Sequence, residues 1–133
     1  MGLFRTVVEE PGMSAVATIL FVDDEPLMRQ MTAAMLSEEG HEVRTAADAR
    51  EALEILREHG SISVVITDVN MPGMNGMELA EVLGRERPGT KVIFASGRED
   101  LAPALARTRH QVLMKPYSMV QLLDAVALEL GRE

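Results

Sequence analysis

Short apolar segments alternate with longer segments of helical periodicity along most of this chain. The apolar segments are rich in Val and Ile and do not alternate with polar residues, which is typical of strands buried on both faces of a parallel sheet. They predict strands at residues 17–22, 41–46, 63–67, 91–95 and 111–114. The segment HEVRTA, at 41–46, is the exception. Its apolar and polar residues alternate, which predicts a strand at the edge of the sheet.

Each predicted strand is followed by a segment with helical spacing, and most of these segments begin at a residue that favours a helix start. The predicted helices are 26–39, 48–59, 75–86, 99–107 and 118–130, of which 99–107 is weakened by Pro103. Strands and helices that alternate in this way, (βα)5, predict an α/β fold with helices on both faces of one parallel sheet. We expect a single domain over 17–130, an N-terminal extension at 1–16 and a C-terminal tail at 131–133.

Composition narrows the classes of function. The net charge of −8 argues against nonspecific binding to nucleic acid, which needs clustered cations to neutralise phosphates. The longest apolar run, at 13–22, is too short for a membrane span of about 20 residues. The absence of cysteine excludes disulfides and thiolate chemistry and agrees with a reducing cytoplasm. We therefore expect a cytoplasmic protein without nucleic-acid or membrane partners.

Polar residues stand at the carboxyl ends of four of the five predicted strands. Asp23 and Asp24 follow the first strand, Asp68 the third, Ser96 the fourth and Lys115 the fifth. In open α/β sheets the carboxyl ends of the strands form the ligand site, so these side chains are expected to converge. Three carboxylates in one pocket favour a hard divalent cation such as Mg²⁺. A lysine and a hydroxyl beside them suit a phosphoryl group, which predicts phosphoryl transfer with an aspartate as nucleophile.

This constellation resembles the receiver domain of bacterial two-component response regulators, of the stand-alone type. The resemblance spans about residues 17–130 and rests on four motifs in order: DDEP after the first strand, D-x-x-M-P-G-M-x-G after the third, S-G after the fourth and K-P-Y after the fifth. It implies a flavodoxin-like three-layer sandwich with strand order 2-1-3-4-5. It also implies a protein that is not a metabolic enzyme and catalyses only its own phosphorylation and dephosphorylation.

The resemblance also implies a role for each matched residue. Asp68 would be the phosphoacceptor, and Lys115 would hold the phosphoryl group. Asp24 would bind Mg²⁺ directly with Asp68, Asp23 would act mainly through water, and the Asn70 backbone carbonyl would complete the protein ligands. Ser96 would swing toward the phosphate, and the Lys115–Pro116 peptide would be cis.

Two features near these motifs concern signalling. The family often has an aromatic switch residue three positions before the lysine, where this chain has Val112, while Tyr117 fills a different position. Met28, Met31 and Met35 recur at helical spacing and are expected to pack in the core. The family would alternatively place a kinase-docking patch near Leu27 and Met31.

The partners implied are a sensor histidine kinase or histidine phosphotransfer protein and an unidentified downstream protein. A phosphorylation-dependent homodimer through the fourth and fifth helices is left open, as is the choice between relay and effector. The alternative function is a degenerate receiver that acts as a phosphorylation-independent interaction module. An aspartate-nucleophile phosphatase is disfavoured because its D-x-D pattern is missing, and a flavodoxin is disfavoured because adjacent acids would repel the FMN phosphate.

Overall fold

The strands of this chain form one parallel sheet. The computed structural model describes residues 16–97, 105 and 107–131, and within them the spatial order of the strands is β3-β2-β4-β5-β6. By position along the chain this is the predicted order 2-1-3-4-5, with the alternating strand at the edge. The strands are β2 (Thr18–Val22), β3 (Glu42–Ala46), β4 (Val64–Asp68), β5 (Lys91–Ser96) and β6 (Gln111–Met114).

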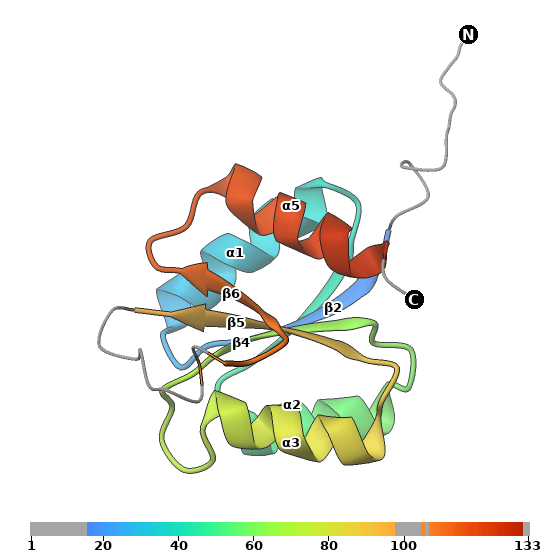
Figure 1. Ribbon diagram of the computed structural model, residues 1–133. Coiled ribbons are helices and arrows are strands. Elements are labelled where there is room, and N and C mark those ends of the chain that lie inside the picture. The colour runs from blue at the N-terminus through green and yellow to red at the C-terminus, as the bar shows by residue number, and fades with distance from the viewer. Residues whose placement is uncertain (1–15, 98–104, 106, 132–133) are drawn as a thin grey trace, which may run out of the picture.

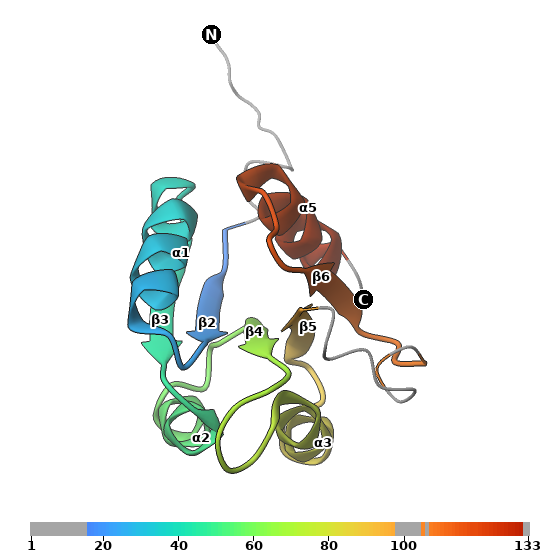
Figure 2. The ribbon, with the colours of Figure 1, turned by 90° about the vertical axis from the view of Figure 1, so that its left-hand side faces the viewer.

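Helices cover both faces of the sheet, which gives the predicted three layers (Figures 1 and 2). Helices α1 (Pro26–Glu38) and α5 (Met119–Leu130) lie on one face, and α2 (Ala49–Glu58) and α3 (Gly76–Glu86) lie on the other. The predicted helix at 99–107 falls mostly outside the described residues. Leu105, which is described, is buried in the core on the α2–α3 side.

The core consists of two apolar clusters separated by the sheet. Successive side chains of a strand point to opposite faces, so each buried strand contributes to both clusters. In β2, Leu20 and Val22 pack toward α2 and α3, whereas Ile19 and Phe21 pack toward α1 and α5. This two-sided burial explains why the central strands carry consecutive apolar residues, as at 19–22.

Three of the predicted helix starts are confirmed by their capping hydrogen bonds. The side chains of Asp48, Asn75 and Ser118 each accept a hydrogen bond from the backbone N–H three residues on. Asn75 and Ser118 form reciprocal capping boxes with Glu78 and Gln121. Caps of this kind stabilise a protein by about 1 kcal/mol each.

Two strands end one residue later than predicted, and this matters for the site. Asp68 and Ser96 are the last residues of β4 and β5, not the first residues after them. The sheet continues because Asp68 is in register with Ala95, and Ser96 with Met114. Both side chains are therefore carried by paired strands, whose backbone is more rigid than that of a loop.

The expectation that the methionines of α1 are core residues is only partly correct. Met28 and Met35 are half-buried against the cluster on the α1–α5 side, but Met31 is 55% exposed. Leu27, one turn earlier, is also exposed.

Candidate functional site

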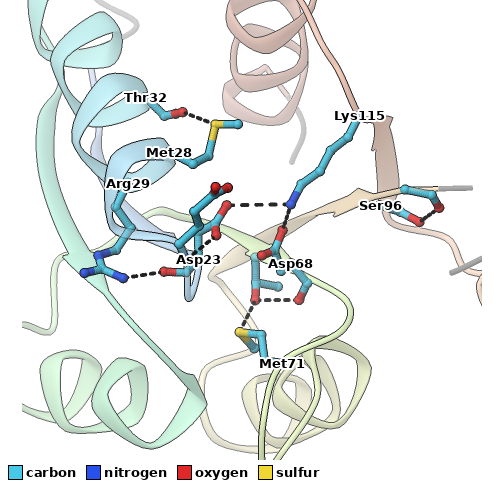
Figure 3. Close-up of polar contacts among 11 residues, drawn as sticks. Asp23, Met28, Arg29, Thr32, Asp68, Met71, Ser96 and Lys115 are labelled. Carbon is cyan, nitrogen blue, oxygen red and sulfur yellow. Dashed lines mark hydrogen bonds and ion pairs between the residues drawn. The ribbon is translucent and has the colours of Figure 1, made fainter. Parts of the chain in front are cut away.

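Lys115 lies between two buried carboxylates at the carboxyl edge of the sheet. Its Nζ contacts Oδ1 of Asp68 directly and lies 3.6 Å from Oδ2 of Asp23 (Figure 3). The three residues come from the ends of β4, β2 and β6, so the predicted convergence is confirmed. Asp23 is 1% exposed and Asp68 is 5% exposed, whereas Lys115 reaches the site from a half-buried position.

The turn between β2 and α1 holds Asp23 in place through its side chain and its backbone. Its Oδ1 accepts a hydrogen bond from the Glu25 N–H at 2.9 Å, and its carbonyl accepts one from the Arg29 guanidinium at 2.8 Å. Its own N–H donates to the Ala46 carbonyl on β3 at 3.0 Å. The Asp23 side chain thus stabilises the turn that precedes α1, and its Oδ2 still faces Lys115.

The loop after β4 is built closely around the backbone of Asp68. The Thr67 hydroxyl donates to the Asp68 carbonyl at 3.0 Å, and the Gly76 N–H donates to the Val69 carbonyl at 2.8 Å. A Cβ on Gly76 would overlap the Asp68 carbonyl, so only glycine fits there. Gly73, at φ +75°, turns the loop in the left-handed region that glycine adopts at little cost.

Three carboxylates meet at this edge. One oxygen each from Asp23, Asp24 and Asp68 lie within 4.8 Å of one another, with Asp24 exposed to solvent. Oδ2 of Asp23 and Oδ1 of Asp68 are both buried, and both face the Lys115 ammonium group. A cluster of hard oxygen donors with one side open to water fits the ligand preference of Mg²⁺, which usually retains several waters.

Ser96 is present at the site but its side chain faces away from Asp68. The Ser96 hydroxyl is buried and donates to the Gly97 carbonyl at 2.9 Å (Figure 3). The backbone places Ser96 beside Lys115, whose N–H donates to the Ser96 carbonyl at 2.8 Å. Its predicted movement toward a phosphate remains a prediction, and it would require this hydroxyl to leave Gly97.

Asn70 follows β4 and is exposed, and its role through the backbone carbonyl remains a prediction. The Lys115–Pro116 peptide is cis, as the resemblance implies. Arg29 and Thr67 fix the backbones of Asp23 and Asp68, and neither was predicted as a site residue. Nothing in the sequence marks them, because neither belongs to a recognisable motif.

Burial and neighbouring charge set the ionisation of the site. Burial is the main cause that raises the pKa of Asp68 to about 7; the Lys115 contact acts in the opposite direction, and the Asp23 charge adds to the effect of burial. Burial by itself lowers the pKa of Lys115, but the hydrogen bond and charge of Asp68 together with Asp23 outweigh it, and the net pKa is raised. Lys115 therefore stays cationic, and Asp68 changes charge near neutral pH.

Comparison with known proteins decides the family. The family model for the response regulator receiver domain matches residues 19–127, which include every residue of the site. The chain belongs to this family. This receiver domain is 36% identical over 126 residues to the sensor kinase CckA of Brucella abortus. The aligned region covers 92% of this chain and 13% of that kinase. The domain is also 36% identical over 114 residues to the transcriptional regulatory protein TcrA of Mycobacterium tuberculosis, covering 84% and 45% of the two chains.

Solved receiver domains share the fold over most of the chain. A response regulator receiver domain protein from Clostridium thermocellum superposes with a TM-score of 0.81 at 36% identity, covering 88% of this receiver domain and 96% of that chain. A CheY-like receiver domain protein from Methanospirillum hungatei gives a TM-score of 0.77 at 31% identity, covering 86% and 94%. The flavodoxin-like fold is therefore confirmed. By contrast, this chain spans less than half the length of the two curated relatives named above.

Among the described residues, none of the helices has the length and apolar character needed to cross a membrane. This agrees with the absence of a long apolar run in the sequence.

Proposed function

We propose that this receiver domain is a phosphoacceptor in which Asp68 takes a phosphoryl group from a phosphohistidine, with Mg²⁺ as cofactor. The observation that carries the proposal is the contact of Lys115 Nζ with Asp68 Oδ1 beside Asp23 and Asp24. The Lys115 ammonium group is fixed against the Asp68 carboxylate, and the carboxylates of Asp23 and Asp24 lie close enough to bind a metal ion together with it. This arrangement supports phosphoryl transfer to Asp68.

Asp68 is the nucleophile in this proposal. One of its carboxylate oxygens attacks the phosphorus of the donor, the P–N bond of the phosphohistidine breaks, and the imidazole leaves with the electron pair of that bond. Lys115 then exchanges its contact with the Asp68 carboxylate for one with a phosphoryl oxygen, which keeps the charge of the transferred group neutralised. Because Asp68 ends a paired strand, the nucleophile is held in position before the donor arrives.

Asp23, Asp24 and Asp68 would hold the Mg²⁺ ion, and the Asn70 carbonyl would be a further ligand. When bound, the ion neutralises charge on the phosphoryl oxygens during transfer. The three carboxylates fit it because they are hard oxygen ligands and because Asp24 lies on the exposed side, where water can complete the coordination. Asp23, which is buried and bound by the Glu25 N–H, would act mainly through a water molecule.

The expected partners are a sensor histidine kinase or a histidine phosphotransfer protein on the donor side and an unidentified protein downstream. Relatives of this chain include parts of a sensor kinase and of a transcriptional regulatory protein, so receiver domains like this one occur in proteins with different outputs. We propose a cytoplasmic signalling role in which the only chemistry is the gain and loss of the phosphoryl group on Asp68. Relay and effector roles, and a phosphorylation-dependent homodimer, are both compatible with it.

The test is intact mass spectrometry after incubation with acetyl phosphate and Mg²⁺. We expect an addition of about 80 Da, one phosphoryl group, that is absent in Asp68→Asn and absent when Mg²⁺ is chelated. An adduct that persists in Asp68→Asn would overturn the assignment of the phosphoacceptor. If no adduct forms and a beryllofluoride titration also shows no binding, the domain is better described as a phosphorylation-independent interaction module.

A further inference from the structure

A cavity lined by methionines lies beside the phosphoacceptor site, on the face covered by α1 and α5. It has a volume of about 260 Å³. Four methionines line it, Met28, Met31 and Met35 from α1 and Met119 from α5, together with Lys115 and Tyr117. Lys115 therefore connects the phosphoacceptor site with the cavity: its Nζ contacts Asp68, and the residue also lines the cavity wall. No residue of the predicted phosphoryl chemistry other than Lys115 reaches this cavity.

Tyr117 has a buried hydroxyl that lacks a hydrogen-bond partner within the described residues. It lies beside Thr32, but the Thr32 hydroxyl donates to the Met28 sulfur at 3.6 Å. Burial raises the pKa of Tyr117, so the phenol remains neutral and retains its proton. A buried hydroxyl without a partner is costly, and such a group is uncommon in folded proteins. A small displacement of the ring, or rotation of the Thr32 hydroxyl, would give it one.

The strand position that often carries an aromatic switch in this family holds no ring here. Val112 lies in β6 and is half-buried against the core cluster on the α2–α3 side. Its side chain is small and branched, and it has no polar atom that could report a change at Asp68. Tyr117 lies on the opposite side of the sheet, where it packs against the α1–α5 cluster.

We propose that Tyr117 is a positioning residue that couples the state of Asp68 to the shape of the methionine cavity. The inference rests on the proposed function. When Asp68 carries a phosphoryl group, Lys115 shifts to the phosphoryl oxygens, and the short Lys115–Pro116–Tyr117 segment moves the phenol relative to α1. The Tyr117 hydroxyl then donates a hydrogen bond of full geometry to the Thr32 oxygen, which can accept it while the Thr32 hydroxyl still donates to the Met28 sulfur. Phosphorylation is thereby reported on the α1–α5 face.

The sequence provides a direct probe, since Tyr117 is the only tyrosine and the chain has no tryptophan. Intrinsic emission of the full chain therefore comes from this one ring. Beryllofluoride with Mg²⁺ is added as a phosphoryl analogue, and its binding is followed separately by ¹⁹F NMR. We expect a change in Tyr117 emission intensity and in its quenching by acrylamide that saturates together with the bound ¹⁹F signal. Neither change is expected in Asp68→Asn or with Mg²⁺ alone.

Methyl-labelled methionine gives a second readout, with Met31→Leu and Met119→Leu used to assign the cavity signals. We expect the methyl signals of the cavity methionines to shift when beryllofluoride binds, by more than that of Met74 on the α2–α3 side. In Tyr117→Phe and in Thr32→Val, both checked for loading by ¹⁹F NMR, these shifts should fall by at least half. Each variant removes one of the two hydroxyls and keeps most of the side-chain volume.

The outcomes separate the inference from the proposed function. A bound ¹⁹F signal with unchanged Tyr117 emission and unshifted cavity methionines would overturn the coupling and leave the phosphoacceptor role intact. The coupling would also be overturned if the methyl signals of the cavity methionines shifted as much in Tyr117→Phe and Thr32→Val as in the wild type. The hydroxyls of Tyr117 and Thr32 would then not transmit the change. Absence of any bound ¹⁹F signal in the wild type would overturn the proposed function, and the coupling with it.

Discussion

Gly76 packs directly against the backbone of Asp68. A Cβ at Gly76 would overlap the Asp68 carbonyl oxygen, although Gly76 lies eight positions further along the chain, at the start of α3. The loop between them, D-x-x-M-P-G-M-x-G, therefore returns to the strand end from which it leaves. The position of the proposed nucleophile consequently depends on a residue that carries no chemistry.

Gly76→Ala should disturb both stability and phosphorylation. The methyl group must displace the backbone of Asp68, and overpacking of this kind costs about 1–3 kcal/mol of unfolding free energy. We expect that loss in urea unfolding, together with slower formation of the acetyl phosphate adduct. Gly84→Ala is the matched control, since Gly84 lies in the same helix with open space around it and should gain about 0.5–1 kcal/mol. Equal stabilities of the two variants would contradict the close approach at Gly76.

Asp68 should make the stability of the metal-free domain depend on pH. The pKa of Asp68 is about 7 in the folded chain against 3.8 for an ordinary aspartate, so the folded state holds the proton more tightly than the unfolded state. The contribution of the protonated Asp68 to the free energy of unfolding is fully present below about pH 4 and is lost as the pH rises through about 7. Asp68→Asn has no such proton, so the melting temperature of the variant relative to wild type should rise between pH 5 and pH 8 in chelator. A difference that stays constant over this range would show that Asp68 ionises normally.

In the proposed metal site, Lys115 and Mg²⁺ would compete for the same carboxylates. In Lys115→Ala the charges of Asp23 and Asp68 lose their cationic contact, so Mg²⁺ should bind more tightly, on the order of tenfold, while phosphorylation becomes slower. Isothermal titration with Mg²⁺ measures the affinity. Lys91→Ala is the control, because Lys91 is the other lysine of the chain and lies at the opposite end of β5. Weaker Mg²⁺ binding in Lys115→Ala than in Lys91→Ala would contradict this description of the site.

Tyr117→Phe should stabilise the unphosphorylated domain. The substitution removes a buried hydroxyl that has no hydrogen-bond partner within the described residues and leaves the ring that packs against the α1–α5 cluster. We expect a gain of about 1 kcal/mol in unfolding free energy, the lower end of the cost of an unsatisfied buried donor. Circular dichroism in urea measures it. A loss of similar size would show that the hydroxyl already has a partner, such as an ordered water.

The sequence predicts the sheet and the convergence of the site for a simple physical reason. Parallel strands all present their carboxyl ends at one edge, so Asp23, Asp68 and Lys115 had to meet once the strands were recognised. Capping residues such as Asn75 and Ser118 were predictable because their chemistry is local. The ends of β4 and β5 were one residue off because pairing with the neighbouring strand, not the local pattern, decides where a strand ends.

Other features depend on tertiary packing and left no mark in the sequence. The exposure of Met31 depends on which neighbours cover α1, and helical periodicity alone does not specify them. Two side-chain contacts depend on rotamers that the surrounding structure selects. They are the hydrogen bond of the Ser96 hydroxyl to the Gly97 carbonyl and that of the Arg29 guanidinium to the Asp23 carbonyl. The unpaired hydroxyl of Tyr117 likewise became apparent only when its neighbours were known.

The positions of the site residues along the chain also bear on synthesis. The acidic members come from β2 and β4, in the first half of the domain, whereas Lys115 follows β6, the last strand to be made. Until β6 pairs with the sheet, the carboxylates lack the cation that neutralises them, so a chain truncated before β6 could not complete the site. In the proposed function, competence to accept a phosphoryl group would then coincide with completion of the sheet, and partly folded copies would not respond.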